Sequence, residues 1–204
     1  MRAEILAMNV FLLSFAGLWA GSATVRAQAS PQAEQEKMAR CDRDLCGIIV
    51  NPTAHGGPLQ CDLVQVWSKE DIAKAVKKGR LSWTFGDARC TAKFEIDRAL
   101  LAAPFKEKNY TLKVPPQPVG CEIDNAGSRH ELRAKMGPVI EFENGKAKSV
   151  SLGVSDIDGT AIVRNVVWAA WKFESTFGYF QADFVKGVNE YIAEHCPKQN
   201  ARAD

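Results

Sequence analysis

The chain has 204 residues, of which 46% are hydrophobic and 25% are charged, and its formal net charge is +2. This near-neutral charge gives no argument for nucleic acid as a partner or for binding to an anionic membrane surface. The length that remains after removal of a leader fits one domain or a tightly joined pair of domains, and it is long enough to bury a core.

Residues 1–27 are predicted to be a secretory signal peptide. Arg2 gives a weakly basic start, residues 5–20 form a mostly apolar run, and residues 25–27 match a small-residue cleavage pattern. A membrane anchor is the alternative, but this run is shorter than the roughly 20 residues that a spanning helix needs. We therefore expect a secreted or periplasmic protein, with no stable membrane span after cleavage.

All six cysteines follow the predicted cleavage site. An even number of cysteines in an exported chain is typical of a disulfide framework. The residues expected to form bridges are Cys41, Cys46, Cys61, Cys90, Cys121 and Cys196.

The pairing of these cysteines is open from the sequence, but two expectations follow from their positions. Cys90 and Cys121 occupy apolar positions in alternating runs, so we expect them to bridge each other inside the core. Cys196 follows the last helical run and is expected to tie that helix to residues 41–61. A zinc site is the alternative, but its four potential ligands lack the paired spacing of a zinc motif. These potential ligands are Cys41, Cys46, His55 and Cys61, and we expect no metal and no cofactor.

The segment before the first predicted helix is polar and rich in turn-forming residues. Residues 28–40 lack a clear period, which predicts a flexible leader or a frayed first helical turn. Residues 41–61 are expected to be mainly loop, with turns at 51–53 and 56–58. Within that loop, residues 47–50 are expected to form one short strand.

Residues 68–79 carry the clearest local signal, which is an N-terminal capping pattern. Ser68 suits the N-cap and Asp71 follows three residues later, while Trp67 and Ile72 are spaced for a hydrophobic staple. The C-terminal Gly79 suits a left-handed cap. The pattern predicts a short helix.

From residue 81 the apolar period changes to two, which predicts antiparallel strands. Residues 81–85 and 90–96 are expected to form a hairpin, and residues 98–108 a helical turn ended by Pro104. Further strands are expected at residues 110–114, 119–123, 132–136, 140–142 and 150–154. The residues that alternate with these apolar positions are charged or carry hydroxyl groups, so one face of the sheet is expected to be exposed to water.

Residues 159–196 form the longest run with helical apolar spacing. Val163, Val167 and Trp171 share one face, and Phe184 continues the series further along. The run is rich in aromatic residues, whose apolar surface must be shielded from water. It is therefore expected to form a long helix pair that packs over the apolar face of the sheet.

Together these elements predict an α+β fold. We expect an antiparallel sheet of six to seven strands, with one face covered by the aromatic C-terminal helix pair. A short helix precedes the sheet, and disulfides stabilise the fold. The expected single domain spans residues 41–196, and a polar tail follows at residues 197–204.

Two sequence patterns suggest chemistry, and both are incomplete. His55 precedes two glycines, as in the glycine-rich oxyanion loops of some hydrolases, but the chain lacks the required G-x-S-x-G motif. Asp156 and Asp158 resemble part of a calcium loop, but the twelfth position counted from Asp156 is Val167, which cannot ligate. A histidine in a turn and a strand-to-helix turn are the favoured interpretations, and no catalytic residue is predicted.

The C-terminal aromatic residues are the best candidates for ligand binding. Burial in a packed core is the simpler interpretation, but a helix that is apolar on more than one side also suits the wall of a cavity. The predicted ligand-binding residues are Trp168, Phe173, Phe177 and Phe184.

The function predicted from the sequence is therefore a secreted or periplasmic binding module without catalysis. Its expected partner is a small apolar ligand or an envelope protein. The alternatives are an envelope hydrolase that uses His55 and a purely structural envelope protein. The binding hypothesis predicts a cavity, whereas the hydrolase hypothesis predicts a cleft in which His55 meets a serine or a carboxylate.

Overall fold

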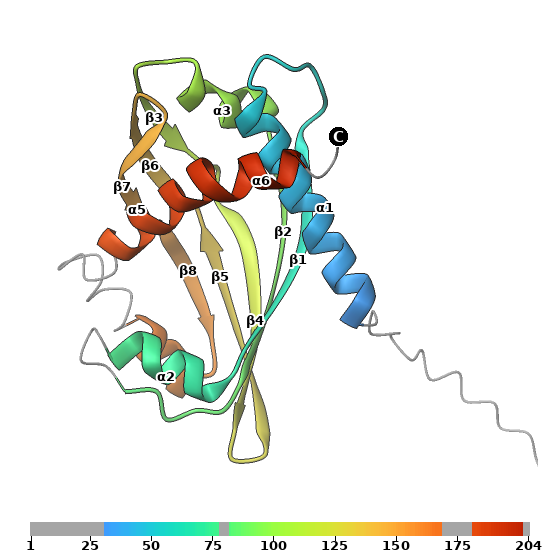
Figure 1. Cartoon of the computed structure of the whole chain (residues 1–204). Coiled ribbons are helices and arrows are strands. Elements are labelled where there is room, and N and C mark those ends of the chain that lie inside the picture. Colours follow the sequence, from blue (N-terminus) through green and yellow to red (C-terminus); the bar gives the residue numbers. More distant parts are fainter. Residues whose placement is uncertain (1–30, 78–81, 169–180, 202–204) are drawn as a thin grey trace, which may run out of the picture.

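The computed structural model describes residues 31–77, 82–168 and 181–201. In these residues the fold is α+β, with a five-stranded antiparallel sheet in the order β1-β2-β4-β5-β8 and a three-stranded antiparallel sheet in the order β3-β6-β7 (Figure 1). The strands are β1 (Leu59–Trp67), β2 (Ala88–Ile96), β3 (Asn109–Lys113), β4 (Gln117–Asn125), β5 (Ser128–Met136), β6 (Val139–Glu143), β7 (Lys146–Ser151) and β8 (Val154–Gly159).

The helices precede, interrupt and follow these strands. They are α1 (Pro31–Val50), α2 (Lys69–Lys77), α3 (Arg98–Ala102), the 3₁₀ turn η1 (Ala103–Phe105), α5 (Gln181–Glu190), the π-helical turn η2 (Tyr191–His195) and α6 (Cys196–Asn200). Residues 161–168 are also helical.

The two sheets are joined by strands that bend from one into the other. β3 leads into β4, β5 into β6 and β7 into β8, and the pairing partners continue across each junction. The Gly137 N–H donates to the Gly153 carbonyl at 3.1 Å, so the bends of neighbouring strands coincide. Gly153 has φ +56°, and a Cβ there would collide with the Gly137 carbonyl oxygen, so this crossing requires glycine. The bent sheet gives the helices one inner face to pack against.

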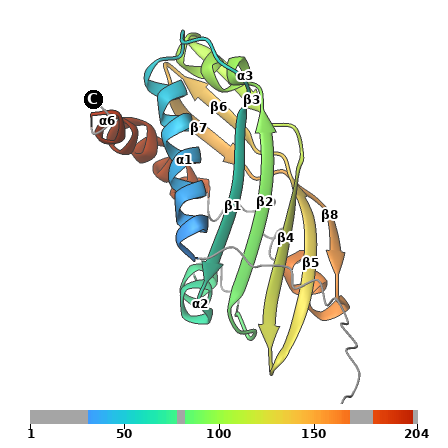
Figure 2. The same cartoon turned by 90° about the vertical axis from the view of Figure 1, so that its right-hand side faces the viewer.

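The inner face carries two hydrophobic cores, and α1 and α2 lie on the same side of the five-stranded sheet (Figure 2). The first core lies between α1, α3 and both sheets. Its buried members are Cys41, Ile48, Leu59, Cys61, Ile96, Leu101, Ala102, Leu112, Phe142, Ala147 and Val150. The second core lies at the opposite end of the five-stranded sheet, beside α2 and the helical residues 161–168. Its buried members are Phe85, Ala88, Ile123, Leu132 and Val163.

All six cysteines are paired in three disulfides, Cys41–Cys61, Cys46–Cys196 and Cys90–Cys121. This confirms the expected Cys90–Cys121 pair, which joins residues opposite each other on β2 and β4, although both residues are only partly buried. It also confirms that Cys196 ties the last helix to the region around α1. Three disulfides are typical of a chain that folds in an oxidising, extracellular-type environment.

The N-terminal cap predicted at Ser68 is confirmed at the start of α2. The Asp71 N–H donates to the Ser68 hydroxyl at 3.1 Å, and that hydroxyl donates to the Asp71 carboxylate at 2.7 Å. Ile72 packs against the second core, whereas Trp67 stays 41% exposed. The predicted C-terminal cap, Gly79, lies outside the described residues.

The loop expected at residues 41–61 is confirmed for residues 51–58, but it is wrong for residues 41–50, as is the short strand expected there, because residues 31–50 form the helix α1. The first half of this helix is polar, and salt bridges from its side chains to the sheet hold it in place. Glu34 pairs with Arg89 of β2, and Lys37 lies 2.6 Å from the Asp62 carboxylate of β1. The short strand expected at residues 47–50 is the last turn of this helix, with Ile48 fully buried.

The hairpin expected between residues 81–85 and 90–96 is also wrong. β2 pairs with β1 and β4 instead, and residues 82–87 form no strand. The apolar residues of this segment serve another purpose than strand formation. Phe85 is buried in the second core, and the Trp83 indole N–H donates to the Gly86 carbonyl at 2.9 Å.

The strand expected at residues 150–154 divides at the bend into the end of β7 and the start of β8. Residues 155–159, expected to form a turn, belong to β8, where Asp156 has φ +50° beside an irregularity in the pairing with β5. The described chain therefore has two sheets in place of one sheet of six to seven strands. The expected aromatic helix pair stays a prediction, because residues 169–180 lie outside the described part.

Candidate functional site

An apolar chamber lies between α5 and the three-stranded sheet, and α1 and α3 close its sides. Its volume is about 460 Å³, within the roughly 300–1,000 Å³ of small-molecule sites. Its lining is apolar except for the Asp183 side chain and the Tyr191 hydroxyl. The larger side chains that form the wall are Leu45, Ile49, Leu101, Leu112, Ile140, Phe142, Phe184, Val188 and Ile192.

A second apolar hollow, the sheet groove, continues from the chamber along the inner face of the five-stranded sheet. Its volume is about 380 Å³, and it shares Val114 and Pro138 with the chamber. These two residues lie at the bend between the sheets, where the Val114 N–H donates to the Pro138 carbonyl at 2.9 Å. The chamber and the groove therefore follow one inner surface across the bend.

Strand alternation places the groove residues on this surface. Leu63, Ala92 and Val119 line the groove and are neighbours across β1, β2 and β4, so their side chains leave the same face of the sheet. In the chamber, Phe184 and Val188 are four residues apart on α5, so they lie on one face of that helix.

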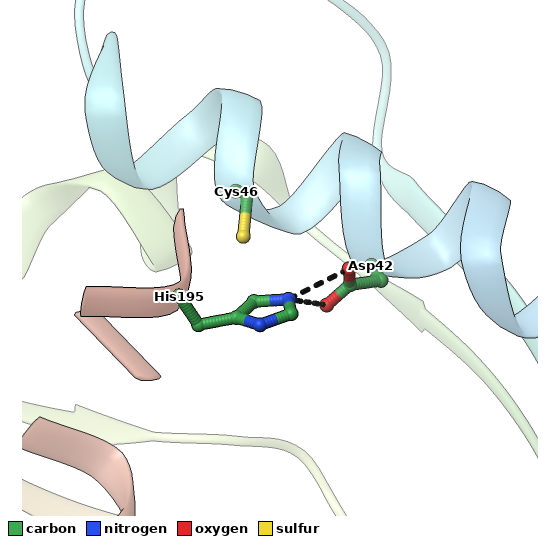
Figure 3. Close-up of side chains that lie close together, drawn as sticks. All are labelled: Asp42, Cys46 and His195. Atoms are coloured by element: carbon green, nitrogen blue, oxygen red, sulfur yellow. Dashed lines mark hydrogen bonds and ion pairs between the residues drawn. The ribbon is translucent and has the colours of Figure 1, made fainter. Parts of the chain in front are cut away.

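A polar cluster on Asp42 links α1 to the helix that carries one wall of the chamber, and Figure 3 shows Asp42 of this cluster beside His195 and Cys46. The Asp42 carboxylate accepts hydrogen bonds from the Tyr191 hydroxyl at 2.7 Å and from the Gln199 amide at 3.0 Å. The His195 Nε2 lies 2.9 and 3.0 Å from its two oxygens. The three partners come from a single face of the C-terminal helix, and the Cys46–Cys196 disulfide lies beside them. We call Asp42, Tyr191, His195 and Gln199 the Asp42 latch.

The π-helical turn helps to align this latch. Within η2, the rings of Tyr191 and His195 stack with centroids 5.0 Å apart and planes inclined by 17°. Burial and the hydrogen bond to Asp42 raise the pKa of Tyr191 well above its ordinary value. The hydroxyl therefore stays protonated and acts as a hydrogen-bond donor, while its ring lines the chamber.

Asp42, Cys46 and His195 also have the residue types of a metal site, with ligand atoms within 4.8 Å of one another. The Cys46 sulfur is bonded to Cys196 and is therefore not a thiolate. Asp42 and His195 then supply two ligands, fewer than the three protein ligands of a catalytic zinc site. In the disulfide-bonded chain these residues connect α1 to the C-terminal helix.

Of the residues predicted to bind a ligand, Phe184 lines the chamber. Trp168 ends the helical residues 161–168, is 48% exposed, and is not part of the chamber or groove lining. Phe173 and Phe177 lie outside the described residues. The ligand-binding role of all four stays a prediction.

His55 lies in the loop between α1 and β1 and is exposed. Within the described ranges, it has no hydrogen bond to a serine or a carboxylate, and it does not line the chamber or the groove. The arrangement that the hydrolase alternative requires has not formed around this residue in the described chain.

The sequence reading missed the contribution of α1 to the site. Leu45 and Ile49 line the chamber from α1, and Asp42 holds the latch. Cys41, Leu45 and Ile48 have helical spacing, which is the signal that could have identified this face. The spacing of Tyr191, His195 and Gln199 likewise places three polar residues on one helix face.

Comparison of the chain with protein-family models, with curated proteins and with solved structures finds no match. In the described part of the chain, none of the helices combines the length and the apolar composition needed to cross a membrane. Function is therefore inferred from the chamber, the groove and the residues around them.

Proposed function

We propose that this protein is a non-catalytic binding module that holds a small apolar ligand in the chamber, in a secreted or periplasmic setting. The chamber itself carries the proposal. It has a volume of about 460 Å³ and a wall assembled from α1, α3, the three-stranded sheet, the bend residues Val114 and Pro138, and α5. An apolar ligand would leave water for a surface that has almost no polar group to satisfy.

The polar groups at the chamber favour binding over catalysis. The Tyr191 hydroxyl is already bonded to Asp42, and its raised pKa keeps it from acting as a base near neutral pH. Asp183 is exposed on the first turn of α5. A reaction would need a nucleophile or a base directed at the ligand, and the described wall supports neither role.

The predicted aromatic helix pair fits this proposal as a further source of ligand contacts. Phe184 supplies one such contact from α5. In the proposal, Trp168, Phe173 and Phe177 extend the apolar surface that the ligand meets. An envelope protein that inserts an apolar side chain is the competing occupant, and a small-molecule titration separates the two.

A titration with the uncharged fluorophore N-phenyl-1-naphthylamine tests the proposal on the full disulfide-bonded chain. We expect saturable binding with enhanced emission, which Gly187→Phe weakens by about tenfold or more. Gly187 lines the chamber on α5, and a Cβ at this position meets no atom within 4 Å. The Cβ of the new side chain therefore has room, and its ring is expected to occupy space at the ligand site.

Gly47→Phe is the matched control, because Gly47 also lies in a helix, also has open space at its Cβ, and does not line the chamber. It should leave the titration unchanged. Absence of saturable binding, or equal weakening by both variants, would count against the chamber as the ligand site. Thermal unfolding of each variant checks that the fold is retained.

A further inference from the structure

A wide hollow adjoins the chamber at the end of the three-stranded sheet. It has a volume of about 950 Å³ and lies between the residues after η1, the β6–β7 turn and the helix formed by α5 and η2. Phe105 and Ile192 line both this hollow and the chamber, so the two spaces meet at these side chains. We call this space the lysine hollow.

The charges around the lysine hollow are not balanced. Lys186 pairs with Glu190 at 3.6 Å, and Glu194 pairs with Lys198 at 3.8 Å. After these pairs are set aside, the charged residues that remain in the lining are three lysines and one glutamate, all of them exposed. They are Lys106, Lys108, Lys146 and Glu107.

These three lysines have no ion pair with any described residue, and neither does Glu107. Their excess positive charge lies at the end of an apolar chamber, beyond Phe105 and Ile192. Charge complementarity at this position therefore favours an anionic group over a cationic or neutral one.

The opposite end of the chamber continues into the sheet groove at Val114 and Pro138. The order of the spaces is thus a cationic hollow, an apolar chamber and an apolar groove. A single extended molecule with one charged end and one long apolar chain matches this order. A compact apolar molecule would use the chamber alone.

We propose that the ligand is a single-chain anionic amphiphile, with its anionic head beside Lys106, Lys108 and Lys146 and its alkyl chain in the chamber. This inference rests on the proposed function, and it adds the chemical class of the ligand. The alkyl chain gains free energy by leaving water, at about 0.8 kcal/mol per buried CH₂ group. The lysines select the head group and add little affinity individually, because exposed charge pairs are weak.

The class of ligand is tested by displacing bound N-phenyl-1-naphthylamine with three competitors. These are dodecanoate, dodecan-1-ol and dodecylammonium, which carry the same alkyl chain and differ in the charge of the head group. We expect dodecanoate to displace the fluorophore at about tenfold lower concentration than the alcohol, and the ammonium to be the weakest. The advantage of dodecanoate should shrink as salt is raised from 0.05 to 0.5 M, because salt screens exposed charges.

The variant Lys106→Gln/Lys108→Gln/Lys146→Gln should remove most of the advantage of dodecanoate over the alcohol and leave fluorophore binding unchanged. Lys69→Gln/Lys74→Gln/Lys77→Gln on the distant helix α2 removes the same number of charges and is the matched control. Two results would overturn the proposal of an anionic head group without affecting the proposal of an apolar site. One is equal displacement by dodecanoate and dodecan-1-ol, and the other is equal effects of the two triple variants. Failure of the fluorophore itself to bind would overturn both.

Discussion

The two cores of the molecule are built in different ways. The second core is small and packs around Val163, which is fully buried. The first core is larger, yet the chamber lies in it, so part of its apolar surface faces open space. The first core also contains cross-links between distant parts of the chain. These are the Cys41–Cys61 disulfide, the Cys46–Cys196 disulfide and the Asp42 latch.

This difference indicates how the fold keeps an open apolar hollow beside its first core. An apolar wall that faces a void loses dispersion contacts on one side. A long-range covalent link lowers the entropy of the unfolded chain and offsets that loss. We infer that the bridge from α1 to α6 stabilises the wall of the chamber, whereas the second core is stable by packing.

The largest effect is expected from removal of the bridge that spans most of the chain. Cys46 and Cys196 are 150 residues apart, whereas Cys90 and Cys121 are 31 apart. Replacing the first pair by alanine should lower the free energy of unfolding by about 4–5 kcal/mol, and the second pair by about 2–4 kcal/mol. Urea unfolding measures both values, and the reverse order would contradict the assigned role of the α1–α6 bridge.

A pair of valines compares the packing of the two cores directly. Val163→Ala removes methyl groups from a filled site and should cost about 2–3 kcal/mol of unfolding free energy. Val188→Ala makes the same change at the wall of the chamber and should cost about 1 kcal/mol or less, because some contacts are already missing. Equal costs in urea unfolding would indicate that the chamber wall is packed as tightly as the second core.

The Asp42 latch gives a pH-dependent prediction. The pKa of Tyr191 is raised in the folded chain, so above about pH 10 the unfolded chain loses a proton that the folded chain keeps. The unfolding free energy of the wild type should therefore fall as the pH rises above 10, by at most about 1.4 kcal/mol per pH unit from this group.

Tyr191→Phe should cost about 1–2 kcal/mol at pH 7, because Asp42 loses a donor. The variant should also lose the Tyr191 part of the alkaline dependence, so its deficit relative to wild type should narrow between pH 8 and pH 11. A constant deficit over that range would show that the hydroxyl is not held by the latch. Lysine titration affects both proteins and cancels in this difference.

The smallest effect is expected at the β4–β5 turn, outside both cores. Ala126 has φ +48°, a left-handed conformation that asparagine tolerates better than alanine. Ala126→Asn should raise the unfolding free energy by up to about 1 kcal/mol in urea unfolding. Asn144, at φ +50° in the β6–β7 turn, already has the favoured residue, so Asn144→Ala should have the opposite sign.

Local chemistry predicted the parts of the fold that depend on neighbouring residues. The capped helix at Ser68 follows from a local capping pattern, and the Cys90–Cys121 pair follows from the alternation of apolar residues along each strand. The errors arose where distant residues decide the structure. The polar start of α1 is held by Glu34–Arg89 and Lys37–Asp62, and no local pattern contains such pairs.

The same limit applies to the site. The aromatic content of the C-terminal run predicted Phe184 as a ligand-binding residue; Phe184 lines the chamber, and its binding role stays a prediction. The opposite wall comes from Leu45 and Ile49, which are more than a hundred residues earlier in the chain. The bend of the sheet, the Cys46–Cys196 bridge and the Asp42 latch bring these surfaces together, and all three depend on residues far apart in the chain, so sequence spacing could not reveal the cavity.

The most direct test of the central claim is a crystal structure of the full disulfide-bonded chain soaked with 1-bromonaphthalene, with anomalous diffraction recorded from bromine. An apolar site in the first core predicts one strong bromine peak in the chamber, within contact distance of Phe142 and Phe184. A chamber without a bromine peak, in crystals where bromine occupies only surface positions, would contradict the account.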